Sequence, residues 1–198
     1  MSTLITNAID TVNETSDLEF KTKGITRLKI TADGALTAGD ASGFGKVVQV
    51  VSDTFNYPET YYSNVWRDTP LSIALTKVAA ANDVLIRVSL SCGTEGPWGN
   101  CGFRVLLNGS AIAGATGTQS GQRWAQWQGG MFYYVGHHGT FHLGGEYLDN
   151  TGGTSHTYKV QVHGDNTHGH NAYLNRGGDT INHGGGGVST VTVMEIAA

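Results

Sequence analysis

Proline, cysteine and charged residues are all scarce in this chain of 198 residues, which has 3 prolines, 2 cysteines and 14% charged side chains. The 29 glycines follow no period of three and have few prolines beside them, which excludes a collagen helix. No apolar run is long enough to span a bilayer, so we expect no membrane insertion. Residues 1–7 (MSTLITN) lack a cationic start and an apolar run, so they predict no secretion signal.

Basic clusters and catalytic motifs are also missing. Twelve basic and sixteen acidic residues give a net charge of −4 without a concentrated cationic patch, which argues against a nucleic-acid partner. We find no nucleophile elbow and no helix-borne zinc-protease motif. The glycine run 184–187 is not followed by the Lys and Ser/Thr of a phosphate-binding loop. The sequence therefore predicts a protein that is not an enzyme, although two distant carboxylates could still form a glycosidase pair.

The first 43 residues differ from the rest of the chain. Residues 17–23 and 26–31 alternate between apolar and polar side chains, and Gly24 lies between them, which predicts two short strands and a turn. Two such strands bury too few apolar side chains to be stable alone. We therefore expect residues 1–43 to be a docking or oligomerisation segment that packs against other copies of the chain.

Residues 44–198 show β signals at the regular spacing of a sandwich or jelly roll. Asn108-Gly109 is a strong hairpin signal at the end of one of these runs. Residues 76–82 could form a single helical turn, and no longer helix is indicated. The predicted fold is all-β, a jelly-roll-like β-sandwich head after a short N-terminal β segment. The expected strands are 47–51, 71–75, 84–90, 103–107, 130–135, 140–143, 156–163, 171–174 and 188–196.

The two cysteines, Cys92 and Cys101, bracket a loop of eight residues. If they close the two ends of a hairpin they are cross-strand neighbours, and a disulfide would staple the loop in an oxidising medium. The alternative is two free thiols in a chain that folds under reducing conditions. Spacing alone does not decide between the two.

All eight histidines lie in the last third of the chain, and His168 and His170 form a His-x-His pair. An extended backbone would place both imidazoles on one face, so copies around a symmetry axis could share a metal ion. The alternative is that both side chains face water from a loop rich in glycine and asparagine. No other cofactor is indicated.

Aromatic side chains are the other candidate site. Flat rings beside polar donors suit stacking against sugars, but Trp and Tyr are equally favoured in subunit interfaces and in the core. The candidates for contact with a glycan or receptor are Tyr61, Tyr62, Trp98, Trp124 and Trp127.

Several segments resemble virion proteins of bacteriophages. Residues 17–22 and 27–34 are similar to strand pairs that wrap a three-fold axis in phage fibres and appendages. Residues 45–52 resemble the start of the head that follows, and the ending 188–198, with 173–176, is similar to virion structural proteins of marine and cyanobacterial phages. This resemblance implies a jelly-roll-like head, a homotrimer and a place on the virion after synthesis in the host cytoplasm. The chain lacks a long repeating shaft, and its segments 53–69 and 92–100 have no counterpart in that pattern.

The function we expect is that of a non-enzymatic phage structural protein, a trimeric fibre or spike attached to other virion proteins. Three alternatives stay open. A capsid decoration protein would bind heads and not cells, and a receptor-recognition module would bind a host surface glycan. A depolymerase would release sugar from host polysaccharide.

Overall fold

The computed structural model describes residues 18–22, 25–30, 36–38, 46–61, 65–94, 100–118, 125–131, 140–164, 171–177 and 186–198. The chain forms two compact units, residues 1–45 and 46–198. The sequence placed this boundary two residues earlier. The described part of the chain holds no helix long and apolar enough to cross a membrane.

The first unit contains a small antiparallel sheet. Its strands are β1 (Leu18–Thr22), β2 (Ile25–Ile30) and β3 (Leu36–Ala38), in the order β1-β2-β3. Both strands that the alternation predicted are present, and they pair with each other through a bulge after Phe20. The third strand was not anticipated from the sequence, because three residues carry too little pattern to be recognised.

In the described residues of the second unit, β-strands are the only regular secondary structure. Its strands are β4 (Val47–Phe55), β5 (Glu59–Tyr61), β6 (Arg67–Thr76), β7 (Asp83–Thr94), β8 (Asn100–Leu107), β9 (Ser110–Ala111), β10 (Gln128–Met131), β11 (Thr140–Asp149), β12 (Ser155–Gly164), β13 (Ala172–Leu174) and β14 (Ser189–Ile196). The predicted all-β fold is confirmed. Most observed strands are longer than the runs that predicted them, and β5 and β9 were not expected.

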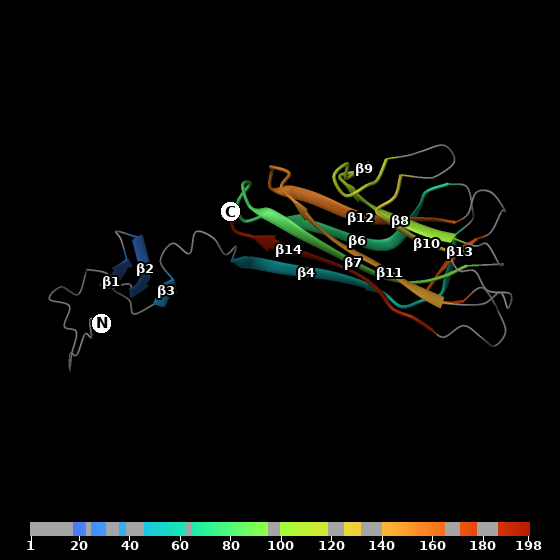
Figure 1. The fold of residues 1–198 in the computed structure, drawn as a ribbon, viewed down its shortest axis with the longest axis horizontal. Helices are drawn as coiled ribbons and strands as arrows, with labels where there is room; N and C mark the ends of the chain where they lie inside the picture. Colours follow the sequence, from blue (N-terminus) through green and yellow to red (C-terminus); the bar gives the residue numbers. More distant parts are fainter. Residues whose placement is uncertain are drawn as a thin grey trace. The chain divides into compact units, whose positions relative to one another are not determined.

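These strands form two antiparallel sheets packed face to face (Figure 1). One sheet has the order β4-β14-β7-β11, with β13 and β5 continuing it beside the end of β7. The other has the order β10-β8-β12-β6. If the eight principal strands are counted along the chain, these orders are 1-8-3-6 and 5-4-7-2. This connectivity is that of a jelly roll, the architecture that the sequence predicted.

Alternating burial along the strands explains why two layers form. In β7 the side chains of Val84, Ile86, Val88 and Leu90 point inward and are buried, whereas Arg87 points to solvent. The inward rows of β6, β12 and β14 alternate in the same way. Each sheet therefore has one apolar face, and packing these two faces together forms the core.

The hairpin predicted at Asn108-Gly109 is confirmed. Both residues have positive φ angles, 50° and 85°, and they connect β8 to β9 with Leu107 opposite Ser110. A two-residue turn with two positive φ angles has the twist that a hairpin needs, and asparagine followed by glycine tolerates this conformation best.

Two local predictions are wrong. Residues 77–82 form a tight turn between β6 and β7, with the Asn82 amide donating to the Ala79 carbonyl, and no helical turn forms. Cys92 and Cys101 do not lie across a hairpin, because β7 and β8 belong to opposite sheets. Each of these segments connects two long apolar strands that lie in opposite sheets, so the chain crosses from one sheet to the other there. The local spacing of residues does not predict such a crossing.

A buried carboxylate fixes the turn at residues 77–82. Glu195 points inward from β14 and accepts hydrogen bonds from the side chains of Gln49 and Asn82 and from the amides of Val78 and Ala79. Burial raises the pKa of Glu195, but these hydrogen bonds to the charged form outweigh it and lower the pKa to about 2. One carboxylate thus joins β4, β14 and the turn between β6 and β7.

Glu195→Gln should lower the free energy of unfolding at neutral pH by about 1–3 kcal/mol, because the buried donors lose their charged acceptor. In the native protein the pKa is depressed, so this stabilisation is complete above the unfolded pKa of roughly 4.3 and is lost as the pH falls towards 2. Urea unfolding at pH 7 and pH 3 measures both effects.

Glu146→Gln is the matched control, since Glu146 is half-exposed on β11 and should change stability by less than about 0.5 kcal/mol. Equal losses in the two variants, or a deficit in Glu195→Gln that does not shrink in acid, would contradict this role.

Candidate functional site

The two ends of the second unit differ in the chain segments and side chains that they carry. At one end the chain enters β4, and the amide of Ala197 donates to the carbonyl of Lys46, so the entry point and the C terminus lie together (Figure 1). We call this the proximal end. At the opposite, distal end, β5, β7 and β12 finish and β6 and β8 begin, as the pairs Arg67–Val162 and Cys101–Gly164 show.

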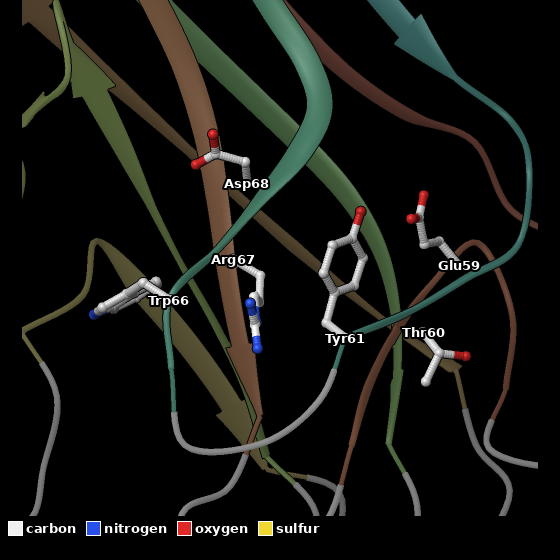
Figure 2. Close-up of a pocket in the computed structure, with 6 residues that line it drawn as sticks. All are labelled: Glu59, Thr60, Tyr61, Trp66, Arg67 and Asp68. Carbon is white, nitrogen blue, oxygen red and sulfur yellow. The ribbon is translucent and has the colours of Figure 1, made fainter.

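A hollow of about 670 Å³ lies at the distal end (Figure 2). Its lining residues are Glu59, Thr60, Tyr61, Trp66, Arg67 and Asp68. They come from β5, from Trp66 immediately before β6 and from the start of β6. Two carboxylates, a guanidinium and two aromatic rings therefore share one surface depression.

Tyr61 is the buried member of this group, with only 4% of its surface exposed. Alternation along β5 places Tyr61 and Glu59 on one side of the strand and Thr60 on the other (Figure 2). Burial, followed by the nearby charge of Glu59, raises the pKa of Tyr61. Its hydroxyl oxygen is buried as well, so Tyr61 contributes its ring to the hollow and does not present a donor to a ligand.

The indole ring of Trp66 lines one side of the hollow and is held in a fixed orientation. The guanidinium of Arg104 in β8 lies 4.4 Å from the centre of its ring, and the ring of His163 in β12 meets it edge to face at 4.4 Å. A cation over an aromatic face and an edge-to-face ring pair both hold the indole in one orientation.

A chain of hydrogen bonds runs from Arg104 across the outer surface of β8, β12 and β6. Arg104 donates to the side-chain oxygen of Gln161 at 2.8 Å, and Gln161 donates to one carboxylate oxygen of Asp68 at 2.7 Å. Lys159 donates to the other oxygen of Asp68 at 2.8 Å. The hydrogen bond from Lys159, and then that from Gln161, lowers the pKa of Asp68.

His163, the other ring in contact with Trp66, is buried and is held by hydrogen bonds of its own. Its two ring nitrogens lie 2.9 Å from the Gln126 side-chain oxygen and 2.8 Å from the carbonyl of Gly164. Gly102 lies beneath these groups, where a β-carbon would clash with Gln126 and His163. Glycine at this position lets the polar side chains approach the sheet closely. We call Trp66, Arg104, Gln161 and His163 the polar wall.

The structure describes only some of the aromatic residues that the sequence proposed for glycan contact. Tyr61 lines the hollow. Trp127 is half-buried and packs between Phe103 and Tyr147, with ring centres 5.8 and 5.9 Å away. Tyr62, Trp98 and Trp124 lie outside the described residues, as do His168 and His170 of the proposed metal pair.

Cys92 and Cys101 are both buried, and their sulfur atoms lie 3.5 Å apart as free thiols. Across the described ranges, no three histidine, cysteine, aspartate or glutamate side chains gather in the manner of metal ligands.

Sequence reasoning missed Arg104, Gln161 and His163 as members of one surface. Alternation in their strands does place Arg104 and Gln161 on the solvent face, which was the available signal. The pairing of β8 with β12, and of β12 with β6, could not be predicted from the sequence. This pairing brings Arg104 and His163 to Trp66, and Gln161 to Arg104.

Comparison with known proteins gives only distant likenesses. No protein-family model matches the chain, and no curated protein does. Among solved structures it is similar to a chain in the "Structure of infectious bursal disease virus Gt strain", with a TM-score of 0.37 and 12% identity, over 83% of this chain and 39% of that one. For the Gx strain of the same virus the TM-score is 0.34 at 11% identity, over 95% of this chain and 50% of that one.

The chain therefore spans half or less of the length of these two viral chains. Likenesses at these scores carry no argument about function.

Arg104→Ala should lower the free energy of unfolding by about 1–2 kcal/mol, because it removes the stacked cation from Trp66 and the hydrogen bond to Gln161. Arg87→Ala removes an exposed ion pair with Glu146 on the other sheet and should cost less than about 0.5 kcal/mol. Urea unfolding compares the two variants. An Arg104 variant as stable as the Arg87 variant would mean that the wall contributes nothing to stability.

Proposed function

We propose that this chain is a non-enzymatic structural protein of a virus particle, and specifically a homotrimeric surface appendage of a bacteriophage. The observation that carries the proposal is the jelly roll of the second unit, in which the chain enters at one end and the hollow lies at the other. Jelly rolls recur in viral capsid proteins and in lectins. Among these roles of jelly rolls, the resemblance of residues 17–22, 27–34 and 188–198 to phage virion proteins favours a protein of the phage particle.

The division of the chain supports a docking role for its beginning. Residues 1–45 form a separate unit that contains a three-stranded sheet, and Lys46, the first residue of the second unit, lies at the proximal end of the head. In the proposed arrangement the first unit attaches to other virion proteins, and the distal end of the head faces outward.

The state of Asp68 supports the non-enzymatic part of the proposal. A glycosidase needs one carboxyl group that is protonated at working pH beside a second carboxylate. Both oxygens of Asp68 already accept hydrogen bonds, and its pKa is lowered, so it is a poor general acid. Asp68 is therefore not suited to be the general acid of a glycosidase, which disfavours the depolymerase.

Binding of a host glycan is the second candidate function, and one observation favours it. The hollow combines the exposed guanidinium of Arg67 with the exposed carboxylate of Glu59, beside the fixed ring of Trp66. Sugar hydroxyls are recognised by such groups when an aromatic ring provides an apolar wall. The hollow belongs to the appendage, so both functions can reside in one protein.

The outer face of the β4-β14-β7-β11 sheet supports self-association. Val50, Met194, Leu85 and Leu148 are directly paired from strand to strand, so they form one apolar row across the whole sheet. The residues at its two ends, Val50 and Leu148, are 55% and 49% exposed. A row that reaches both sheet edges offers two different patches, as a cyclic head-to-tail assembly requires.

Light scattering behind a sizing column should give a mass of three times 20.9 kDa for the full chain. Leu148→Lys should shift the mass to that of one chain, since a charge in the apolar row opposes burial. Val78→Lys is the control, because Val78 is 72% exposed on the turn between β6 and β7 and lies outside the row. A monomeric wild-type chain, or a trimer that Leu148→Lys leaves intact, would contradict the proposed assembly.

The proposed function is tested on gradient-purified particles of the virus that encodes the chain. We expect the chain to sediment with the particles, and added tagged chain to bind host cells and not particles that already carry it. Arg67→Ala should weaken cell binding roughly three- to ten-fold if its guanidinium contacts a glycan, and should leave the mass unchanged. Absence of the chain from particles would overturn the structural role, while binding to heads and not to cells would favour capsid decoration.

A further inference from the structure

The two cysteines approach each other across the core of the sandwich. Cys92 lies in β7 and Cys101 in β8, so they belong to opposite sheets, and their sulfur atoms are 3.5 Å apart. Both side chains are buried, with exposures of 0% and 1%. The chain has no other cysteine, so each thiol has only this one partner within the molecule.

We propose that Cys92 and Cys101 form an intramolecular cross-link between the two sheets when the folded protein meets an oxidising medium. A disulfide bond is about 2.05 Å long, so the sulfur atoms must approach by roughly 1.5 Å. Inter-sheet disulfides of this kind occur in other β-sandwiches, which shows that facing sheets can accommodate the bond.

The oxidant we name is a small-molecule disulfide such as oxidised glutathione. One cysteine, as its thiolate, attacks the small disulfide, forming a mixed disulfide and releasing one small thiol. The second cysteine then displaces the other small thiol and closes the protein disulfide. In total the two cysteines lose two electrons and two protons, and the small disulfide is reduced to two thiols.

The position of the pair determines what the bond would hold. Cys92 is paired with Phe141 of β11 and Leu174 of β13, and Cys101 with Gly164 of β12. Both cysteines therefore lie in strands with neighbours on each side, at the distal end of the head. A bond between them would fasten the two sheets together beside the hollow, where Tyr61 and both cysteines belong to the same buried core.

Burial should make this reaction slow in the folded state. Neither sulfur is accessible to an oxidant, and the hydrogen bond between the thiols, with burial, raises the pKa of Cys92 and so disfavours the reactive thiolate. Closure therefore requires a local opening of the distal end. The thiols should persist through a short exposure to oxidant and disappear during a long one.

The test uses the full chain, purified in its reduced form and then incubated with oxidised glutathione. Tryptic cleavage leaves both cysteines in one peptide, residues 88–104, and cleavage after Glu95 then separates them. We expect the two halves to remain joined in the oxidised sample and to separate after reduction. The oxidised sample should contain no free thiol after denaturation.

The bond should also raise the thermal midpoint. For a closed loop of ten residues in a unit of this size, loop-closure entropy predicts an increase of roughly 5–10 °C over the reduced protein. The comparison uses one wild-type preparation in two redox states, so it needs no variant. In Cys101→Ser the oxidant should leave the midpoint unchanged, because the bond cannot form.

Three results would overturn the proposal. The first is two free thiols after prolonged oxidation under conditions of reversible local opening. The second is cross-links between chains in place of the internal bond. The third is an internal bond that leaves the thermal midpoint unchanged or lowers it. This proposal does not depend on the proposed function, since a cross-link can form in a head of any role.

Discussion

The inward side chains of strand β7 are the contacts on which the head depends most. Val84, Ile86, Val88 and Leu90 are buried against the opposite sheet, and both edges of the same strand are hydrogen-bonded, to β14 and β13 on one side and to β11 on the other. Burial of each such side chain contributes about 1.5–3 kcal/mol. Because β7 organises one sheet and faces the other, it positions the strand ends that carry the hollow.

Polar groups inside the protein hold the connections at the two ends of the sandwich. At the proximal end Glu195 binds the turn at residues 77–82. At the distal end Asn175, in a left-handed conformation with φ of 59°, donates to the carbonyls of Phe55 and Tyr57 and accepts from the hydroxyl of Ser189. Each buried group has specific partners, so it stabilises one arrangement of the connecting segments.

The polar wall bears on recognition because its side chains already have partners within the protein. Arg104 and His163 hold Trp66 before any ligand arrives, and Gln161 holds Arg104, so a ligand would not have to order the ring. Jelly rolls serve many unrelated functions, and the fold alone therefore does not distinguish an adhesive appendage from a shell protein. The distinction depends on what the hollow at the distal end binds and on what the separate N-terminal unit attaches to.

The sequence alone determined the all-β class, the strands in residues 17–31 and the Asn108-Gly109 turn. These features follow from neighbours in sequence, through alternation and the conformational freedom of particular residues. Alternation along 103–107 and 156–163 also places Arg104 and Gln161 on the strand face opposite the apolar side chains. Only the tertiary structure decided that these side chains meet Trp66 and Asp68, that Glu195 is buried, and that the cysteines face each other across two sheets. Alternation shows which residues share a face of a strand, whereas strand pairing and sheet membership depend on burial between segments far apart in the chain.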